Sequence, residues 1–513
     1  MLKKVVQWSF RMCENMSTNS KDNTGRIPGL AIFLLISVFA LGNRSTAIAG
    51  YVLEQGLTGV GGNAVAIAGE ELVIGAPAED GNKGAVHVYR YNSSTMTWIE
   101  EQKLIALDAA ANDLFGLSVA IGNDRIIVGA PFHNEQSGAV YVFRFYPETM
   151  SWLLEQKIMA SDGAQGDVFG SSIAIDGDRL VIGSPADDDK ASRSGAVYVY
   201  RFNSETTMWV QEQKLVASDG TEEDSLGWSV AIDGERIVAG AIQTNNCRCN
   251  PNRAGSAYLF NRLSETWEFK TKLTPPDGIE GDLFGHSVSV SGDRIVVGTL
   301  SANYAYVFRR DNDTMLWTEE QKLAPSDGTP GIEFGSAVAI AGDRIFVGAP
   351  VSNTGRGAVY VLGFDPETRR WAQAQILTGT GASMRPRFGQ SIAAAGERIV
   401  AGEPGSGAAY IYRFTPDSDG DGVPDEQDQC PHSDTRPTVI IDGIDSGVAN
   451  TLLTEAAGCT ITDEILNLAL EAQSHGQFVN KVDKFLLELQ KAGILEPNEK
   501  KAIKDAVAQS SLP

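Results

Sequence analysis

The chain has 513 residues, 54 of them glycine, and its 65 acidic and 42 basic residues give a formal net charge of -23. This charge argues against nucleic acid and anionic membrane surfaces, which both attract basic segments. The length allows two or three domains, and the charge suits a soluble exported protein or one that collects divalent cations.

Residues 1–49 have the features of an export signal. Leu30–Gly42 is a compact apolar run, shorter than the roughly 20 residues that a membrane span needs. Ala47-Ile48-Ala49 supplies a small-x-small cleavage pattern, which predicts Gly50 as the mature N-terminus. The mature chain then has no membrane span, and the alternative is an uncleaved membrane anchor.

From Gly61 to Phe414 the sequence repeats about every 50 to 58 residues. Each copy opens with a glycine, and these are Gly62, Gly116, Gly170, Gly227, Gly285, Gly335 and Gly389. A second glycine follows in each copy, at Gly75, Gly129, Gly183, Gly240, Gly298, Gly348 and Gly402. Seven copies with this period are typical of a propeller or a solenoid.

Four segments of each copy have strand character. In one copy they are residues 171–175, 178–183, 196–201 and a fourth that starts at Trp209. Two-residue turns that contain glycine join the first two segments, at Asp176-Gly177, Asp233-Gly234, Ser291-Gly292 and Ala341-Gly342. Seven copies of four strands predict an all-β, seven-bladed β-propeller over residues 50–414.

Two residue types recur at fixed places in the copies. The fourth strand starts with tryptophan in six of them, at Trp98, Trp152, Trp209, Trp267, Trp317 and Trp371. The second strand starts with arginine at Arg125, Arg179, Arg236, Arg294, Arg344 and Arg398. Ligand-stacking aromatics and anion sites are possible interpretations, but repetition in every unit favours packing between blades and a repeated structural ion pair or carbonyl contact.

The seventh copy ends at Phe414 without a fourth strand. The segment that begins at Tyr51 aligns with the missing strand, because Glu54-Gln55 matches Glu155-Gln156 of a complete copy. We therefore expect the N-terminal strand to close the propeller beside residues 407–414, which would satisfy an open strand edge.

The pattern of Phe115-Gly116 followed by Gly129-Ala130-Pro131 resembles the FG-GAP repeats of integrin α-chain propellers and their bacterial relatives. The resemblance covers about 350 residues. It implies a seven-bladed extracellular binding propeller, with links to adhesion and calcium. Several hairpins of the integrin type carry long Asp-rich calcium loops, whereas the hairpins here are two-residue turns without room for such a ligand set.

Other loops of the propeller are candidates for function. Three of them are acidic, Ser161–Asp167, Ala186–Lys190 and Ser218–Asp224, and each is either a cation site or a solvated turn. Gln243–Arg253 replaces the ordinary connection of the fourth copy and contains Cys247 and Cys249. This loop is either a binding site or a harmless insertion, because specialised loops on a rigid scaffold often bind partners.

An acidic segment follows the propeller, over residues 415–432. Asp417, Asp419, Asp421, Asp425 and Asp428 have the spacing of positions 1, 3, 5, 9 and 12 of an EF-hand-type calcium loop. The carbonyl of Val423 would supply position 7, so the sequence predicts a Ca²⁺ site, with an acidic linker as the alternative. The segment also resembles a thrombospondin type 3 repeat that ends at Cys430.

The C-terminal part of the chain has helical periodicity. Residues 433–459 form a connector, and a disulfide between Cys430 and Cys459 would close a loop there. Residues 460–513 predict three helices, with Thr460 or Thr462 as the first N-cap, Gly493 as a stop and Pro497 in a first turn. This module is either a docking element or a folded end-piece.

No motif for enzymatic chemistry stands out. The five histidines form no HxxxH pair, and the chain has no GxSxG, CxxC or glycine-rich phosphate loop. The sequence favours an exported, calcium-binding, non-catalytic protein whose propeller engages an extracellular protein or glycan. The alternatives are an extracellular hydrolase or lyase that uses loop carboxylates, and a structural surface protein. We expect the exported protein to be extracellular or at the cell surface, with the periplasm as a further possibility, and the sequence leaves its oligomeric state open.

Overall fold

The computed structural model describes residues 50–242, 254–326, 328, 331–381, 383, 385–416, 430, 436–451, 453 and 459–512. These residues belong to two compact units. The propeller unit contains residues 50–416, and the C-terminal unit contains residues 436–512. In the described residues, no helix combines the length and apolar character needed to cross a membrane.

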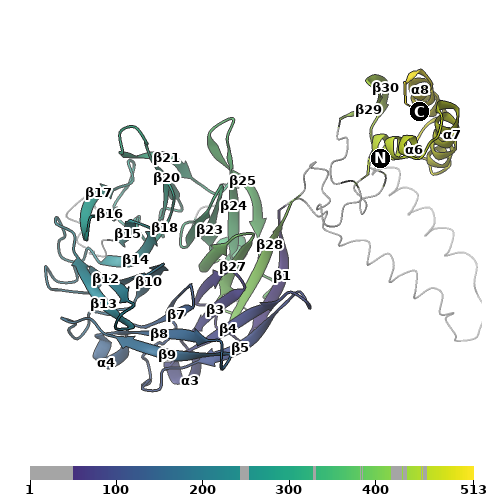
Figure 1. The fold of residues 1–513 in the computed structure, drawn as a ribbon. Helices are drawn as coiled ribbons and strands as arrows, with labels where there is room; N and C mark the ends of the chain where they lie inside the picture. The colour runs from purple at the N-terminus through teal and green to yellow at the C-terminus, as the bar shows by residue number, and fades with distance from the viewer. Residues whose placement is uncertain are drawn as a thin grey trace, which may run out of the picture. The chain divides into compact units, whose positions relative to one another are not determined.

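The propeller unit has seven four-stranded antiparallel sheets arranged in a ring, and each sheet is one blade (Figure 1). Blades 1 to 3 comprise β2 (Ala64–Ala68), β3 (Glu71–Ala76), β4 (Ala85–Asn92), β5 (Thr97–Leu104); β6 (Ser118–Gly122), β7 (Arg125–Ala130), β8 (Ala139–Tyr146), β9 (Ser151–Ile158); and β10 (Ser172–Asp176), β11 (Arg179–Ser184), β12 (Ala196–Asn203), β13 (Met208–Leu215). Blades 4 to 6 comprise β14 (Leu226–Asp233), β15 (Arg236–Ala241), β16 (Ser256–Leu263), β17 (Thr266–Leu273); β18 (Ser287–Ser291), β19 (Arg294–Gly298), β20 (Ala305–Arg310), β21 (Trp317–Leu323); and β22 (Val338–Ala341), β23 (Arg344–Ala349), β24 (Ala358–Asp365), β25 (Arg370–Leu377).

Blade 7 takes its strands from both ends of the propeller sequence. β26 (Ser391–Ala395), β27 (Arg398–Glu403) and β28 (Ala408–Thr415) pair in order, and β1 (Gly50–Thr58) pairs antiparallel with β28. The β1–β28 register runs from Gly50 opposite Thr415 to Thr58 opposite Ala408. The outer strand of blade 7 is therefore the N-terminal segment.

The two ends of each blade differ in their connections. One end, here called the hairpin face, has the turns between first and second strands and between third and fourth strands. The other end, the loop face, has the connections from second to third strands and from one blade to the next. The short helices α3 (Glu79–Asn82), α4 (His133–Gln136) and α5 (Ser352–Gly355) lie in second-to-third connections of the loop face.

The two-residue turns of the hairpin face are shifted by one residue from their predicted positions. Asp176 pairs with Arg179, so the turn consists of Gly177 and Asp178 and not of Asp176 and Gly177. Gly177 has φ +58°, which suits glycine at the first turn position of a primed hairpin turn. The prediction placed glycine second because residue pattern alone does not fix the register.

The recurring glycines are explained by close contact between successive blades. Gly170 has φ +93°, and its carbonyl oxygen lies where a Cβ at Gly129 of the preceding blade would be placed. The same carbonyl accepts a hydrogen bond of 2.7 Å from the Ser118 hydroxyl. Any larger residue at either glycine would push the two blades apart.

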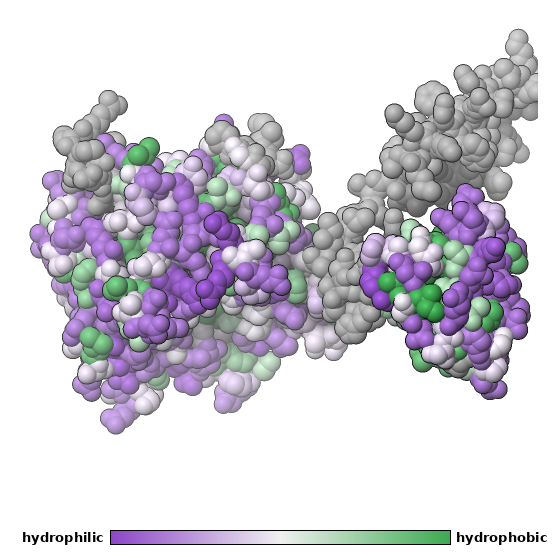
Figure 2. Space-filling model, turned by 90° about the horizontal axis from the view of Figure 1, so that it is seen from above, coloured by the Kyte–Doolittle hydropathy of each residue, from purple (hydrophilic) through white to green (hydrophobic). Residues whose placement is uncertain are grey.

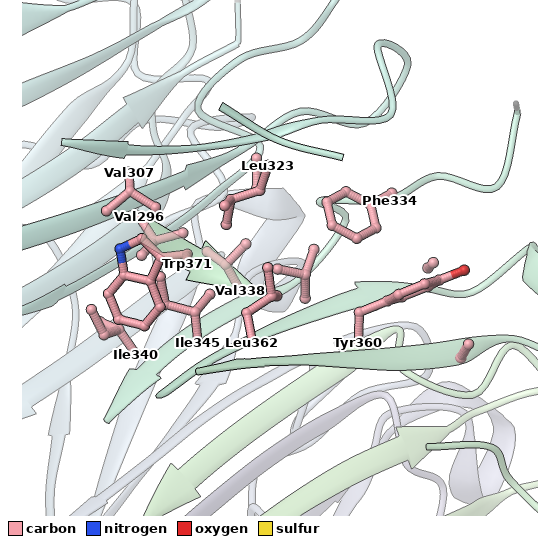
Figure 3. Packing of buried hydrophobic residues seen from close by; sticks show 14 of the residues in the cluster. Val296, Val307, Leu323, Phe334, Val338, Ile340, Ile345, Tyr360, Leu362 and Trp371 are labelled. Carbon is pink, nitrogen blue, oxygen red and sulfur yellow. The ribbon is translucent and has the colours of Figure 1, made fainter. Parts of the chain in front are cut away.

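Hydrophobic clusters fill the space between blades. Figure 3 shows one of them, where Trp371 lies near Ile340 and Ile345. In the same cluster the rings of Phe334 and Tyr360 meet edge to face at 5.2 Å between centroids. Because each cluster takes residues from two blades, the blades stabilise one another and not only themselves.

The C-terminal unit is a β-hairpin and three helices around one core. β29 (Thr438–Ile441) and β30 (Ile444–Ala449) form a hairpin that was not predicted within the connector. The predicted helices are α6 (Ile461–Leu470), α7 (His475–Lys491) and α8 (Pro497–Gln509). Thr460 caps α6, and Phe478 and Ile503 are among the core residues shared with the hairpin.

Candidate functional site

The predicted calcium ligands lie outside the described residues. These are Asp417, Asp419, Asp421, Val423, Asp425 and Asp428. Gln243–Arg253, with Cys247 and Cys249, also lies outside them, and both sites remain predictions. Cys430 and Cys459 are both disulfide-bonded. Within the described residues, no group of three or more histidine, cysteine, aspartate or glutamate side chains is placed to hold a metal ion.

The recurring tryptophans join consecutive blades. At the junction of blades 2 and 3, Gln156 Nε2 donates to the Trp209 carbonyl at 3.0 Å, and the Trp209 backbone N–H donates to Gln156 Oε1 at 2.7 Å. The side-chain amide therefore pairs with the next blade as a backbone peptide would. Equivalent clasps are made by Gln55, Gln102, Gln213, Gln321 and Gln375. The packing interpretation of the tryptophans is confirmed for these junctions.

The recurring arginines form ion pairs in several blades. The closest nitrogen–oxygen distances are 2.7, 2.9 and 2.8 Å in Arg125–Glu155, Arg294–Glu320 and Arg398–Glu54. The glutamate also accepts a hydrogen bond from the indole of the next blade, as Glu320 does from Trp371 at 3.0 Å. These pairs confirm the structural interpretation, but blades 4 and 6 have Lys270 and Ala374 where the glutamate would be.

The acidic loops of the loop face are held by lysine and tyrosine side chains. In blade 3, Lys214 Nζ lies 2.9 Å from Asp162, 2.8 Å from Asp187 and 2.6 Å from Asp189. The Tyr198 hydroxyl oxygen lies 2.9 Å from Asp162 and 2.8 Å from Asp187, so its one proton is shared between these two acceptors. Two of the predicted acidic loops thus meet at one ammonium group. The same triad recurs as Tyr141–Asp108–Lys157, Tyr258–Asp219–Lys272 and Tyr306–Asp277–Lys322.

This network sets the charges on the loop face. Burial by itself raises the pKa of Asp162, but hydrogen bonds from Lys214 and Tyr198 and the ammonium charge outweigh it and lower that pKa. Burial by itself lowers the pKa of Lys214, because it disfavours the charged ammonium, but the hydrogen bonds to Asp187 and Asp189 outweigh it and raise that pKa. These carboxylates are neither simple solvated turns nor free cation ligands, because the protein supplies their counter-ion. Sequence reasoning missed this, although the recurring lysine after Glu-Gln was its signal.

The centre of the loop face is less regular than the junctions. The first strands of neighbouring blades contact one another around the ring, and the residue that follows the opening glycine of each copy varies among the blades. These residues are Asn63, Leu117, Ser171, Trp228, His286, Ser336 and Gln390. A scaffold of repeated strands therefore presents a ring of seven positions whose chemistry changes from blade to blade.

Trp228 is the large exposed side chain of this ring. Its surface is 38% exposed, whereas Trp98, Trp152 and Trp209 are buried in junctions. Its ring centroid lies 6.0 Å from that of His286, whose Nδ1 is 3.1 Å from the Ser336 carbonyl. Burial lowers the pKa of His286 despite that hydrogen bond, so the imidazole is neutral at pH 7. The pair offers an aromatic surface beside a neutral polar ring, which suits stacking with a sugar or contact with a protein side chain.

The side of the molecule seen in Figure 2 has little continuous apolar surface. Figure 2 shows mainly hydrophilic residues with small, separated hydrophobic patches. A large hydrophobic interface therefore does not distinguish one side of the propeller in this view, and the irregular loop-face centre is the best candidate for recognition.

Comparison with known proteins identifies the repeat. The FG-GAP repeat model matches residues 98–143, 152–200, 209–260, 267–308 and 317–362. Each match starts at the tryptophan of one blade and ends in the third strand of the next. Integrin alpha-2 of Mus musculus is 32% identical over 102 residues, which cover 18% of this chain and 9% of the length of that integrin. The structure adds blades at both ends of the matched region.

Proposed function

From the premise that this chain is an FG-GAP repeat β-propeller, we propose that it is an exported, non-catalytic adhesion or recognition protein. Its propeller binds an extracellular protein or glycan, and its acidic segment binds Ca²⁺. The observation that carries the recognition role is Trp228, an exposed indole at the irregular centre of an otherwise repeated loop face. Exposed aromatic side chains are frequent anchors of binding sites.

The non-catalytic role is supported by the carboxylates of the loop face. The alternative hydrolase or lyase would need a pair of loop carboxyl groups free for acid and base chemistry. Asp162, Asp187 and Asp189 instead share the ammonium of Lys214. Export is supported by the apolar segment Leu30–Gly42 and the cleavage pattern that follows it.

The recognition role predicts a large effect of Trp228→Ala. We expect binding to a partner found on arrays of glycans and extracellular proteins to weaken at least tenfold, since an aromatic anchor is worth about 2 kcal/mol or more. Binding constants of the purified chain measure this. Phe269→Ala is the matched control, because Phe269 is an exposed aromatic of the same blade on its outer strand. Equal binding by the Trp228 variant would place recognition elsewhere.

The calcium role predicts one site in the acidic segment. Calorimetric titration of the chain should detect Ca²⁺ binding, and the double variant Asp417→Asn/Asp421→Asn should weaken it at least tenfold, because two charged ligands are lost. The double variant Asp162→Asn/Asp187→Asn removes the same charge from the loop face and should bind normally. The reverse pattern would assign calcium to the propeller and contradict the proposal.

A further inference from the structure

The junction of blades 4 and 5 departs from the other six. Thr271 occupies the position at which the other outer strands have the glutamine of the clasp. Lys270 occupies the position directly before it. Within the described part of the chain, no clasp joins Thr271 to Trp317. The outer strands β17 and β21 also contact each other less than the outer strands at the other junctions do.

Two arginines of this junction lack partners for buried nitrogen atoms. The Nε atoms of Arg236 and Arg310 are buried and have no hydrogen-bond partner. Arg236 Nη2 lies 3.0 Å from Asp233, but that carboxylate also accepts from the Gly292 backbone N–H at 2.8 Å. Among the described residues, Arg310 has no ion pair. The Nε atoms of Arg179 and Arg262 at the junction of blades 3 and 4 are also buried without a partner. What distinguishes the junction of blades 4 and 5 is therefore that no carboxylate of the described residues pairs with Arg310.

The repeat shows where these groups lie relative to one another. In blades 2 and 3, Arg125 is 2.7 Å from Glu155, and its guanidinium lies 4.1 Å from the centroid of Phe202. Arg236, Lys270 and Arg310 occupy the equivalent positions of blades 4 and 5, with the same strand pairing and the same bulge in the outer strand. A carboxylate and an aromatic ring are thus replaced by an ammonium and a second guanidinium.

The preceding junction shows which group would satisfy such a cluster. There Glu212 Oε1 lies 3.2 Å from Arg262, its Oε2 lies 3.9 Å from Arg179, and the Trp267 indole donates to it at 3.1 Å. One glutamate carboxylate therefore lies beside two arginines and the tryptophan of the next blade, although the Nε atoms of both arginines have no hydrogen-bond partner. The junction of blades 4 and 5 has the two arginines and the tryptophan, but Lys270 occupies the position of the glutamate.

We propose that Arg236, Lys270 and Arg310, the basic notch, bind a carboxylate from outside the chain, supplied by a glutamate of an acidic peptide. Glutamate is favoured because it is the residue that fills the equivalent position in five other junctions, at Glu54, Glu101, Glu155, Glu212 and Glu320. The notch belongs to the hairpin half of blade 4, since Arg236 directly follows a hairpin turn, whereas Trp228 belongs to the loop face. It is thus a second site, independent of the proposed function.

The test uses hexaglutamate as the probe, in calorimetry at 0.15 M salt, where repulsion from distant acidic groups is screened beyond about 8 Å. We expect hexaglutamate to bind, and Lys270→Glu and Arg310→Phe each to weaken it at least tenfold. Both variants restore residues that other blades have, so they should fold. Lys270→Glu should also raise the melting temperature, because it replaces a like charge with a carboxylate beside Arg236 and Arg310.

Lys501→Glu is the matched control, because it makes the same charge change at an exposed lysine of α8. Binding that survives Lys270→Glu, or that falls equally in Lys501→Glu, overturns the proposal. Tighter binding of hexagalacturonate or inorganic sulfate than of hexaglutamate overturns the peptide assignment. A lower melting temperature of the Lys270 variant would show that the cluster already has its partners.

Discussion

Removal of β1, residues 50–58, is expected to abolish cooperative folding of the propeller. The strand pairs with β28 along its length, buries Tyr51 and Leu57, and provides Glu54 for Arg398 and Gln55 for Trp98. Losing this many backbone and side-chain bonds costs on the order of 5–10 kcal/mol, which is comparable to the whole stability of a domain. Circular dichroism melting and solubility of the truncated chain measure the effect.

The matched rescue is a permuted chain. Thr415 lies opposite Gly50, in the way that Asn203 lies opposite Met208 across a third-to-fourth turn. Residues 50–58 placed after Thr415 through the turn sequence 204–207 should therefore refold as a fourth strand and restore the melting temperature of the intact chain. A truncated chain that melts like the intact one would show that β1 contributes little to closure.

The second large effect is expected from Glu320→Gln. Glu320 receives two bonds from Arg294, at 2.9 and 3.1 Å, and one from Trp371, and only 11% of its side chain is exposed. Removing the charge leaves a largely buried guanidinium with only the more distant Asp293, at 3.6 Å, which should lower the free energy of unfolding by about 2–4 kcal/mol. Glu319→Gln, at the exposed neighbouring position, should change it by less than about 0.5 kcal/mol.

This effect should depend on pH in a defined direction. Burial by itself raises the pKa of Glu320, but the bonds from Arg294 and Trp371 outweigh it and lower that pKa in the folded protein. Its contribution is therefore complete above the unfolded-state pKa of about 4.3 and is lost as the pH falls through the lower folded-state pKa. The stability difference between the two proteins should shrink over that range in denaturant titrations. A difference that grows with acidity would contradict the assignment.

The fold was largely predictable because the chain contains seven copies of one repeat, which can be compared with one another. Periodicity located the strands, and the likeness of Glu54-Gln55 to Glu155-Gln156 indicated which segment completes blade 7. Side-chain partners were not predictable, because residues such as Asp162 and Lys214 meet only after the blades are stacked. The hairpin at Asp442-Gly443 was missed although an aspartate-glycine turn between apolar runs is a strong local signal.

The candidate site was predictable only in part. The calcium residues were chosen from spacing alone, and they lie outside the described residues. Trp228 was passed over because it does not share the position of the six repeated tryptophans, which turned out to pack between blades. Its departure from the repeat was the available signal. The basic notch was hidden for the same reason, since Lys270 resembles an ordinary surface lysine until its repeat position is considered.

The pairing of Gly50 with Thr415 also determines how the ring responds to force. Both ends of the propeller sequence lie at the same end of an antiparallel pair, so pulling them apart would open the β1–β28 hydrogen bonds one after another at low load. A load between a bound partner and the C-terminal segment enters instead through β28, which is paired on both sides, by β27 and β1. That load would have to break the hydrogen bonds of β28 to both neighbouring strands at the same time. We therefore expect the propeller to resist a load from a bound partner better than a load that pulls its two ends apart.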